Sequence, residues 1–164
     1  MIAQKQTQVT KDLANKKIVV EREFDATPVN VWKAWTEREL LDQWWAPKPW
    51  KTETQKMDFR EGGAWLYCMV GPEGERHWCR VDYKTISKHN SFTGLDAFCD
   101  ENGSINQDLP TMDWKVDFSK TDSGTIVRVE VTFATEADLE KIVEMGFEEG
   151  FTSALGNLDE LLAK

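Results

Sequence analysis

The final stretch of the chain, residues 137–164, carries apolar residues at the three- and four-residue spacing of an amphipathic helix. The apolar stripe changes phase at Gly146, which predicts a short helix that ends at this glycine and a long helix that follows it. A line of small or polar residues runs beside the second stripe: Gly146, Gly150, Ser153 and Asn157. A glycine inside a helix costs about 1 kcal/mol relative to alanine. We therefore expect either the sheet backbone or a bound ligand to lie close to this edge.

Alternating apolar and polar residues predict seven β-strands in the rest of the chain. In residues 75–87 the alternation places His77, Cys79, Val81 and Tyr83 on one face and charged side chains on the other. Tight-turn signals join the six later strands, so these strands are expected to form an antiparallel meander. The predicted strands cover residues 18–26, 50–59, 64–70, 75–87, 91–99, 111–120 and 125–134.

Two short helices are predicted between the first and second strands. Thr27 is suited to be the N-cap of the first helix, with Pro28 at its first position. The capping-box pattern Thr36-Glu37-Arg38-Glu39 predicts the start of the second helix, with Thr36 as its N-cap. Pro47 and Pro49 end this helix, because neither residue can continue it.

These elements predict an α+β fold with the order β-α-α-β-β-β-β-β-β-α-α. One face of the seven-stranded antiparallel sheet must be covered, and the long C-terminal helix is the element long enough to do so. A curved sheet gripping one helix leaves a cavity between them unless side chains fill it. Residues 17–164 are expected to form this domain, and residues 1–16 are expected to be a polar N-terminal tail.

Composition narrows the classes of function. The net charge of −9 argues against a nucleic-acid partner, and no apolar run approaches the roughly 20 residues needed to span a bilayer. The first residues lack a signal-peptide pattern, so we expect a cytoplasmic protein. Three cysteines without CxxC spacing indicate free thiols rather than a disulfide framework. Eight tryptophans suit an aromatic-lined cavity, or a dimer interface near residues 44–50.

Three segments resemble the START-like (SRPBCC) helix-grip superfamily: ATPVNVWKAWTERELLDQWWAP, DFREGGAWLYCMVGPEG and GFEEGFTSALGNLDELL. Within this superfamily the chain is most similar to bacterial single-domain homologues of the C-terminal part of the heat-shock chaperone ATPase activator. The resemblance extends from Lys17 to Leu162, and residues 60–65 (Arg-Glu-Gly-Gly-Ala-Trp) are its most specific part.

The resemblance implies a seven-stranded sheet gripping the C-terminal helix around a deep cavity. It implies no fixed chemistry, no cofactor and no universal catalytic residue, because members include lipid and hormone binders and polyketide cyclases. The chaperone activators also have a separate N-terminal domain, which 16 polar residues cannot replace. A chaperone-partner module is therefore retained only as an alternative function, and a chaperone partner is not expected.

A second alternative is a cyclase- or hydrolase-type enzyme that uses Tyr67, His77 and Asp96 as acid–base groups. These side chains lie on neighbouring predicted strands and could face one space, and histidine titrates near neutral pH. His77 could equally be satisfied by ordinary hydrogen bonds. Asp96 could pair with Arg80 or His77, or be exposed if the strand phase is reversed, since an isolated buried carboxylate is costly. No cysteine or histidine spacing indicates a metal site.

The leading hypothesis is that the cavity binds a small hydrophobic or aromatic molecule. Each aromatic residue taken singly could equally be core, but together they suit the walls or mouth of an apolar pocket. The candidate ligand-binding residues are Trp44, Trp45, Trp65, Tyr67, Met69, His77, Cys79, Asp96, Phe98, Trp114, Gly150 and Phe151.

Overall fold

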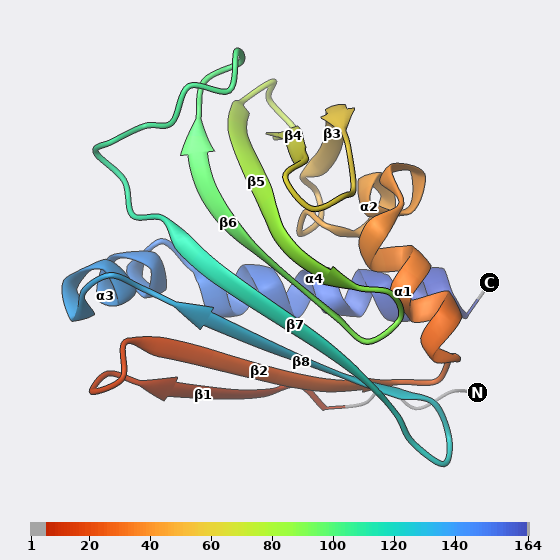
Figure 1. The fold of residues 1–164 in the computed structure, drawn as a ribbon. Helices are drawn as coiled ribbons and strands as arrows, with labels where there is room; N and C mark the ends of the chain where they lie inside the picture. Colours follow the sequence, from red (N-terminus) through yellow and green to blue (C-terminus); the bar gives the residue numbers. More distant parts are fainter. Residues whose placement is uncertain (1–5, 164) are drawn as a thin grey trace.

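One curved antiparallel sheet of eight strands organises the chain in the computed structural model, which describes residues 6–163 (Figure 1). The strands lie side by side in the order β1-β2-β8-β7-β6-β5-β4-β3. Their bounds are β1 Gln8–Asp12, β2 Lys17–Phe24, β3 Lys51–Met57, β4 Ala64–Val70, β5 Arg76–Ser87, β6 Ser91–Cys99, β7 Met112–Lys120 and β8 Thr125–Thr132.

Four helices accompany the sheet. They are α1 Pro28–Thr36, α2 Arg38–Trp44, α3 Glu136–Glu144 and α4 Phe147–Leu162. Helix α4 runs across the sheet and contacts both α1 and α2 (Figure 1). Its side chains Phe151, Ala154, Leu155 and Leu158 are buried in the core that the sheet and helices share. The α+β helix-grip fold predicted from the sequence is confirmed.

The strand count differs from the prediction, since the sheet has eight strands instead of seven. The additional strand is β1, which lies in the segment predicted to be a polar tail and pairs with β2, Gln8 opposite Glu21 and Asp12 opposite Lys17. Alternation could not identify β1, because its side chains are exposed or half-buried and it has no apolar face. The first five residues of the predicted tail lie outside the described residues.

Most predicted helix boundaries are confirmed. The Thr27 hydroxyl accepts a hydrogen bond from the Asn30 amide at 3.3 Å, and Pro28 begins α1. The break between α3 and α4 is at Gly146, whose φ of +91° is left-handed and therefore favours glycine. The prediction of Thr36 as the N-cap of α2 is wrong. The Thr36 hydroxyl instead donates to the Trp32 carbonyl at 2.8 Å within α1, and α2 begins after Glu37 without a side-chain cap.

A buried ion pair joins α4 to the sheet. Arg22 on β2 is 4% exposed and donates a hydrogen bond to the carboxylate of Asp159 on α4. Register shifts occur between Thr54 and Lys56 on β3 and between Tyr83 and Thr85 on β5. Such irregularities bend strands, so they contribute to the curvature of the sheet around the helix.

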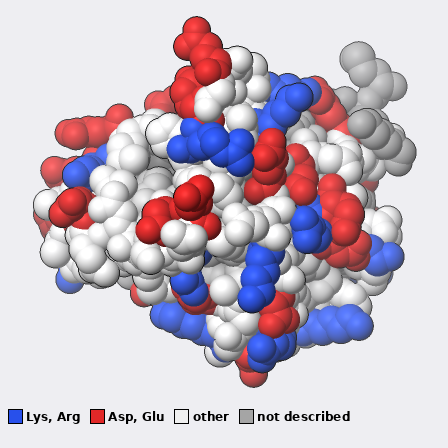
Figure 2. Space-filling model, turned by 90° about the horizontal axis from the view of Figure 1, so that it is seen from above, with Lys and Arg blue, Asp and Glu red and all other residues white. Residues whose placement is uncertain are grey.

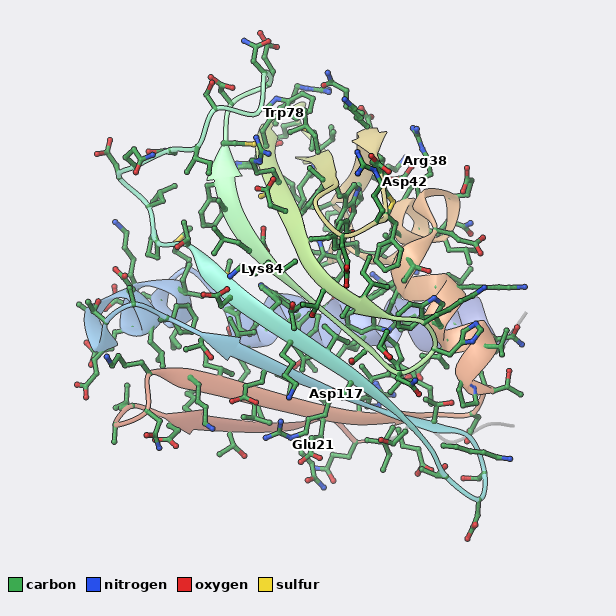
Figure 3. All side chains as sticks on the ribbon, viewed as in Figure 1. Glu21, Arg38, Asp42, Trp78, Lys84 and Asp117 are labelled. Carbon is green, nitrogen blue, oxygen red and sulfur yellow. The ribbon has the colours of Figure 1, made fainter. Side chains whose placement is uncertain are left out.

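The outer face of the sheet is charged. Glu21, Lys84 and Asp117 extend from β2, β5 and β7 on this face (Figure 3). On the face shown in Figure 2, lysine and arginine side chains alternate with acidic ones rather than forming one basic patch.

Within residues 6–163, none of the helices is both long enough and apolar enough to cross a bilayer.

Candidate functional site

A cavity of about 380 Å³ lies between the sheet and the C-terminal helices. This volume falls within the range of roughly 300–1,000 Å³ that is typical of small-molecule sites. Inward-facing residues of β4 to β7 form one wall, the segment after α2 forms a second, and the junction of α3 and α4 forms the third. The lining residues are Trp45, Pro47, Trp50, Tyr67, Met69, His77, Cys79, Asp96, Ala97, Phe98, Met112, Trp114, Ile142, Met145, Gly146, Phe147, Gly150 and Phe151.

Aromatic rings make up much of the wall. The ring of Trp45 lies 5.7 Å from that of Trp114 and 6.1 Å from that of Phe151, measured between centroids. The rings of Trp114 and Phe151 are 5.5 Å apart and nearly perpendicular. The two contacts of Phe151 are edge-to-face and the Trp45–Trp114 contact is tilted at 47°, and such contacts are favourable and hold the rings in fixed orientations. The wall is therefore largely pre-formed and presents ring faces and edges to the cavity.

Contacts from two directions position Trp45. The Asp42 carboxylate on α2 accepts hydrogen bonds from the Thr54 amide at 3.0 Å and the Thr54 hydroxyl at 2.6 Å, which ties α2 to β3 (Figure 3). From α4, the Asn157 amide group donates to the carbonyls of Trp44 at 3.4 Å and Ala46 at 3.0 Å, the two residues that flank Trp45. Helices α2 and α4 are thus joined where Trp45 enters the wall.

Gly150 faces the segment after α2 across the cavity. A β-carbon at this position would meet only the Pro47 side chain, at 3.8 Å, which is an ordinary contact distance. The sheet backbone does not approach this glycine within 4 Å. Of the two readings of the glycine edge, close backbone contact and space beside the helix, the structure shows the second at Gly150.

Asp96 is the one acidic side chain among the residues that line the cavity. It is 5% exposed, and it also lines a second, small cavity of about 20 Å³. Burial raises the pKa of Asp96 to about 7, and a hydrogen bond from the Ala97 backbone amide partly opposes this rise.

The pairing of Asp96 with Arg80 that the sequence left open is not formed. The Arg80 guanidinium instead bonds to the carboxylate of Asp82, at 2.8 and 2.5 Å, and to the Gly103 carbonyl.

Tyr67 and Cys79 lie beside Asp96. Burial, followed by the nearby Asp96 charge, raises the pKa of the Tyr67 hydroxyl and of the Cys79 thiol. Both groups are therefore uncharged at neutral pH, and Cys79 is not a reactive thiolate. The Tyr67 hydroxyl also interacts by hydrogen bonding with Trp45 and Cys79. Tyr67 and Asp96 thus line the same cavity, from two strands that are separated by β5.

His77 does not join this group. It is exposed, and its ring packs against Trp50 with the centroids 5.3 Å apart, so it lies where the cavity meets solvent. Asp96 pairs across the sheet with Val81, which is four residues further along β5 than His77. At about 3.3 Å per residue, the two side chains start roughly 13 Å apart. Tyr67, His77 and Asp96 therefore do not converge on one point.

Comparison with known proteins places this geometry in a family. Residues 25–163 match the family described as Activator of Hsp90 ATPase homolog 1-like protein. The chain belongs to this family. The START-like helix-grip resemblance seen in the sequence is thereby confirmed, and no curated protein matches the chain.

Several solved structures resemble this member of the Activator of Hsp90 ATPase homolog 1-like family. A crystal structure of a Mycobacterium smegmatis protein is 31% identical, covers 95% of this chain and 96% of its own, and has a TM-score of 0.88. A solution structure of an Arthrobacter aurescens protein is 29% identical, with 95% and 91% covered and a TM-score of 0.90. A Nitrosomonas europaea protein is 28% identical, with 92% and 96% covered and a TM-score of 0.80.

Ten of the twelve residues singled out in this family member's sequence line the main cavity, and Trp44 and Trp65 do not. Trp44 is fully buried, and its indole N–H donates to the Ala34 carbonyl at 2.8 Å. Trp65 lines only the small cavity, and its indole N–H donates to the Thr54 hydroxyl at 3.0 Å. Both tryptophans therefore support the wall from behind.

Eight lining residues were not singled out from the sequence: Pro47, Trp50, Ala97, Met112, Ile142, Met145, Gly146 and Phe147. Met112 alternates in phase with Trp114, and Ile142 and Phe147 lie on the predicted apolar stripes, so the pattern places these three toward the interior. The alternation pattern cannot distinguish residues that line the cavity from residues that fill the core. Met145 is 52% exposed and reaches the cavity only because the chain turns at Gly146.

The described residues contain neither a metal-ligand cluster nor a disulfide. Within the described residues, no group of three or more histidine, cysteine, aspartate or glutamate side chains is placed to hold a metal ion. Cys68, Cys79 and Cys99 are all free thiols, as predicted.

Proposed function

We propose that this protein binds a small hydrophobic or aromatic molecule in the cavity between its sheet and α4. The observation that supports the proposal is a space of about 380 Å³ that the protein's own tryptophans border without filling. A hydrophobic ligand that covers the apolar walls removes their surface from water, which favours binding. The contacts of Trp45 with the tilted ring of Trp114 and the edge-to-face ring of Phe151 limit the reorganisation needed for binding.

The alternative functions receive less support. The proposed acid–base trio is divided between the cavity interior, with Tyr67 and Asp96, and the exposed position of His77. For a chaperone-partner module we would look for a joined apolar patch. The large hydrophobic residues that are exposed in the described chain are Leu13, Val29 and Met145, which is little apolar surface for a protein interface.

The test uses two glycines of α4 as a matched pair. Gly150 borders the cavity, whereas nothing lies within 4 Å of a β-carbon added at Gly156. Replacing either glycine by leucine raises helix propensity, by up to about 1 kcal/mol. Only Gly150→Leu places a large side chain in the cavity. We expect it to weaken binding of the neutral fluorescent probe N-phenyl-1-naphthylamine at least about tenfold, and Gly156→Leu to leave binding unchanged.

Fluorescence titration of the two variants and the unaltered protein measures this difference. Native mass spectrometry of the protein purified from cell extract then reports the mass of any natural ligand. Absence of probe binding to the unaltered protein, or equal binding by both variants, would count against this cavity as the site.

A further inference from the structure

The cavity is lined by one acidic residue and by no lysine or arginine among the described residues. Asp96 is 95% buried, and no lysine or arginine is among the described residues that line the space. Among the described residues, no side chain donates a hydrogen bond to the Asp96 carboxyl, whose partner is the neighbouring Ala97 amide. A buried carboxylate is normally paired with a cation or with several donors. The Asp96 carboxylate can therefore accept further hydrogen bonds from a ligand.

The two arginines closest to being buried in the sheet, Arg22 and Arg80, bond to other carboxylates. Arg80 bonds to Asp82 and to the Gly103 carbonyl. Arg22, the buried arginine of the core, bonds to Asp159. No lysine or arginine lines the cavity among the described residues, so a cation that pairs with Asp96 would come from outside the protein.

The surroundings of Asp96 suit a cation. Three aromatic residues of the sheet line the same cavity: Phe98 from the strand of Asp96, Trp114 from the adjacent β7, and Tyr67 from β4, which is separated from β6 by β5. Trp45 and Phe151 face them from the helical side. Aromatic ring faces attract ammonium groups within about 6 Å of the ring centre, most strongly in a site shielded from water. A carboxylate among aromatic rings is thus a site for an organic cation.

We propose that the cavity selects hydrophobic amines, with the protonated nitrogen against Asp96 and the apolar body against the aromatic walls. This inference rests on the proposed function and specifies the chemical class of its ligand. A carboxylate ligand would meet the like charge of Asp96 and no compensating cation. A neutral ligand would leave the Asp96 charge unpaired. The net charge of −9 also favours the approach of cations over anions.

Protonation of Asp96 should make the affinity for amines depend on pH. The titratable groups that face Asp96 are Tyr67, Cys79 and Tyr83, and all three have raised pKa values, chiefly because they are buried. The Cys99 thiol, at the end of the same strand as Asp96, also interacts with Asp96, and burial raises its pKa to about 11. These four groups remain neutral between pH 6 and 8, so Asp96, whose pKa lies near 7, sets the change of charge in the buried part of the cavity, whereas His77 lies exposed at its border. An amine requires the ionised carboxylate, and its affinity should therefore rise as the pH increases through about 7.

The experiment compares three probes with the same ring system: 2-(2-naphthyl)ethylamine, 2-(2-naphthyl)ethanol and 2-naphthylacetate. Calorimetric titration at pH 8 should show the amine binding at least about tenfold more tightly than the alcohol, and the acetate more weakly than both. Asp96→Asn should remove the preference for the amine while the alcohol binds within about threefold of its original affinity. The control Asp113→Asn removes the same charge from an exposed position on β7 and should keep the preference.

Each remaining outcome counts against the proposal. Equal affinities for amine and alcohol would overturn it while leaving the proposed function intact. Tighter binding of the acetate would show that Asp96 acts as a protonated donor. If none of the three probes nor N-phenyl-1-naphthylamine binds, the proposed function fails as well. Thermal melts establish that Asp96→Asn is folded, and Asp96→Leu, which also removes the charge, should lose the amine preference equally.

Discussion

At the scale of single residues, the ionised carboxylate of Asp96 destabilises the folded protein and could be stabilised by a bound cation. A carboxyl group that is 5% exposed and lacks a cationic partner opposes its own ionisation, which is why its pKa rises from 3.8 to about 7. The folded state therefore holds its proton more tightly than the unfolded chain does. Its contribution to stability is most favourable below pH 4 and is lost as the pH rises to about 7.

This behaviour leads to a prediction for Asp96→Asn, which cannot ionise. The free energy of unfolding of the variant, relative to the unaltered protein, should increase between about pH 4 and 7 and level off above pH 8. At 1.36 kcal/mol per pKa unit, the total change is on the order of 4 kcal/mol. Urea unfolding at several pH values measures it, with the exposed Asp113→Asn as the control. A flat difference over this range would mean that Asp96 has a stabilising partner in the folded protein.

At the scale of elements, the cavity depends on how α2 and α4 meet. The Asn157 side chain on α4 bonds to two carbonyls at the end of α2, and these bonds fix the direction in which Trp45 leaves the helix. The sequence indicated that residue 157 belongs to a small or polar edge. It could not indicate that this edge faces the segment 44–47, because the contact joins residues more than 100 positions apart.

We expect Asn157→Ala to lower the free energy of unfolding by about 1–3 kcal/mol, because two buried carbonyl groups lose their donor. Probe binding should weaken as well, since Trp45 is less firmly held. The matched control is Gln43→Ala, which removes an exposed amide that bonds only to the Glu39 carbonyl within α2. This change should alter stability by less than about 0.5 kcal/mol. Equal effects of both substitutions in urea unfolding would show that the Asn157 bonds do not secure the junction.

At the scale of the whole molecule, most of the fold could be predicted from sequence because several long strands alternate between buried and outward-facing residues. Residues 125–131 illustrate this, with Thr125, Val127, Val129 and Val131 all buried. The distinction between cavity and core could not be predicted in the same way. Trp44 and Trp45 are adjacent and chemically identical, yet only Trp45 borders the cavity, because the last turn of α2 sets their directions. Such differences depend on helix phase at a terminus and on distant contacts.

Strand β1 could not be predicted from sequence either, because its pairing depends on neighbouring elements rather than on its own composition. It covers the outer edge of β2, and Lys11 forms an ion pair with Glu148 in the first turn of α4 at 2.8 Å. This short polar ribbon therefore shields a strand whose backbone would otherwise be free to pair with another molecule. A protein shortened to begin at Lys17 should self-associate through Lys17–Phe24, which light scattering would detect as species larger than those of the full chain.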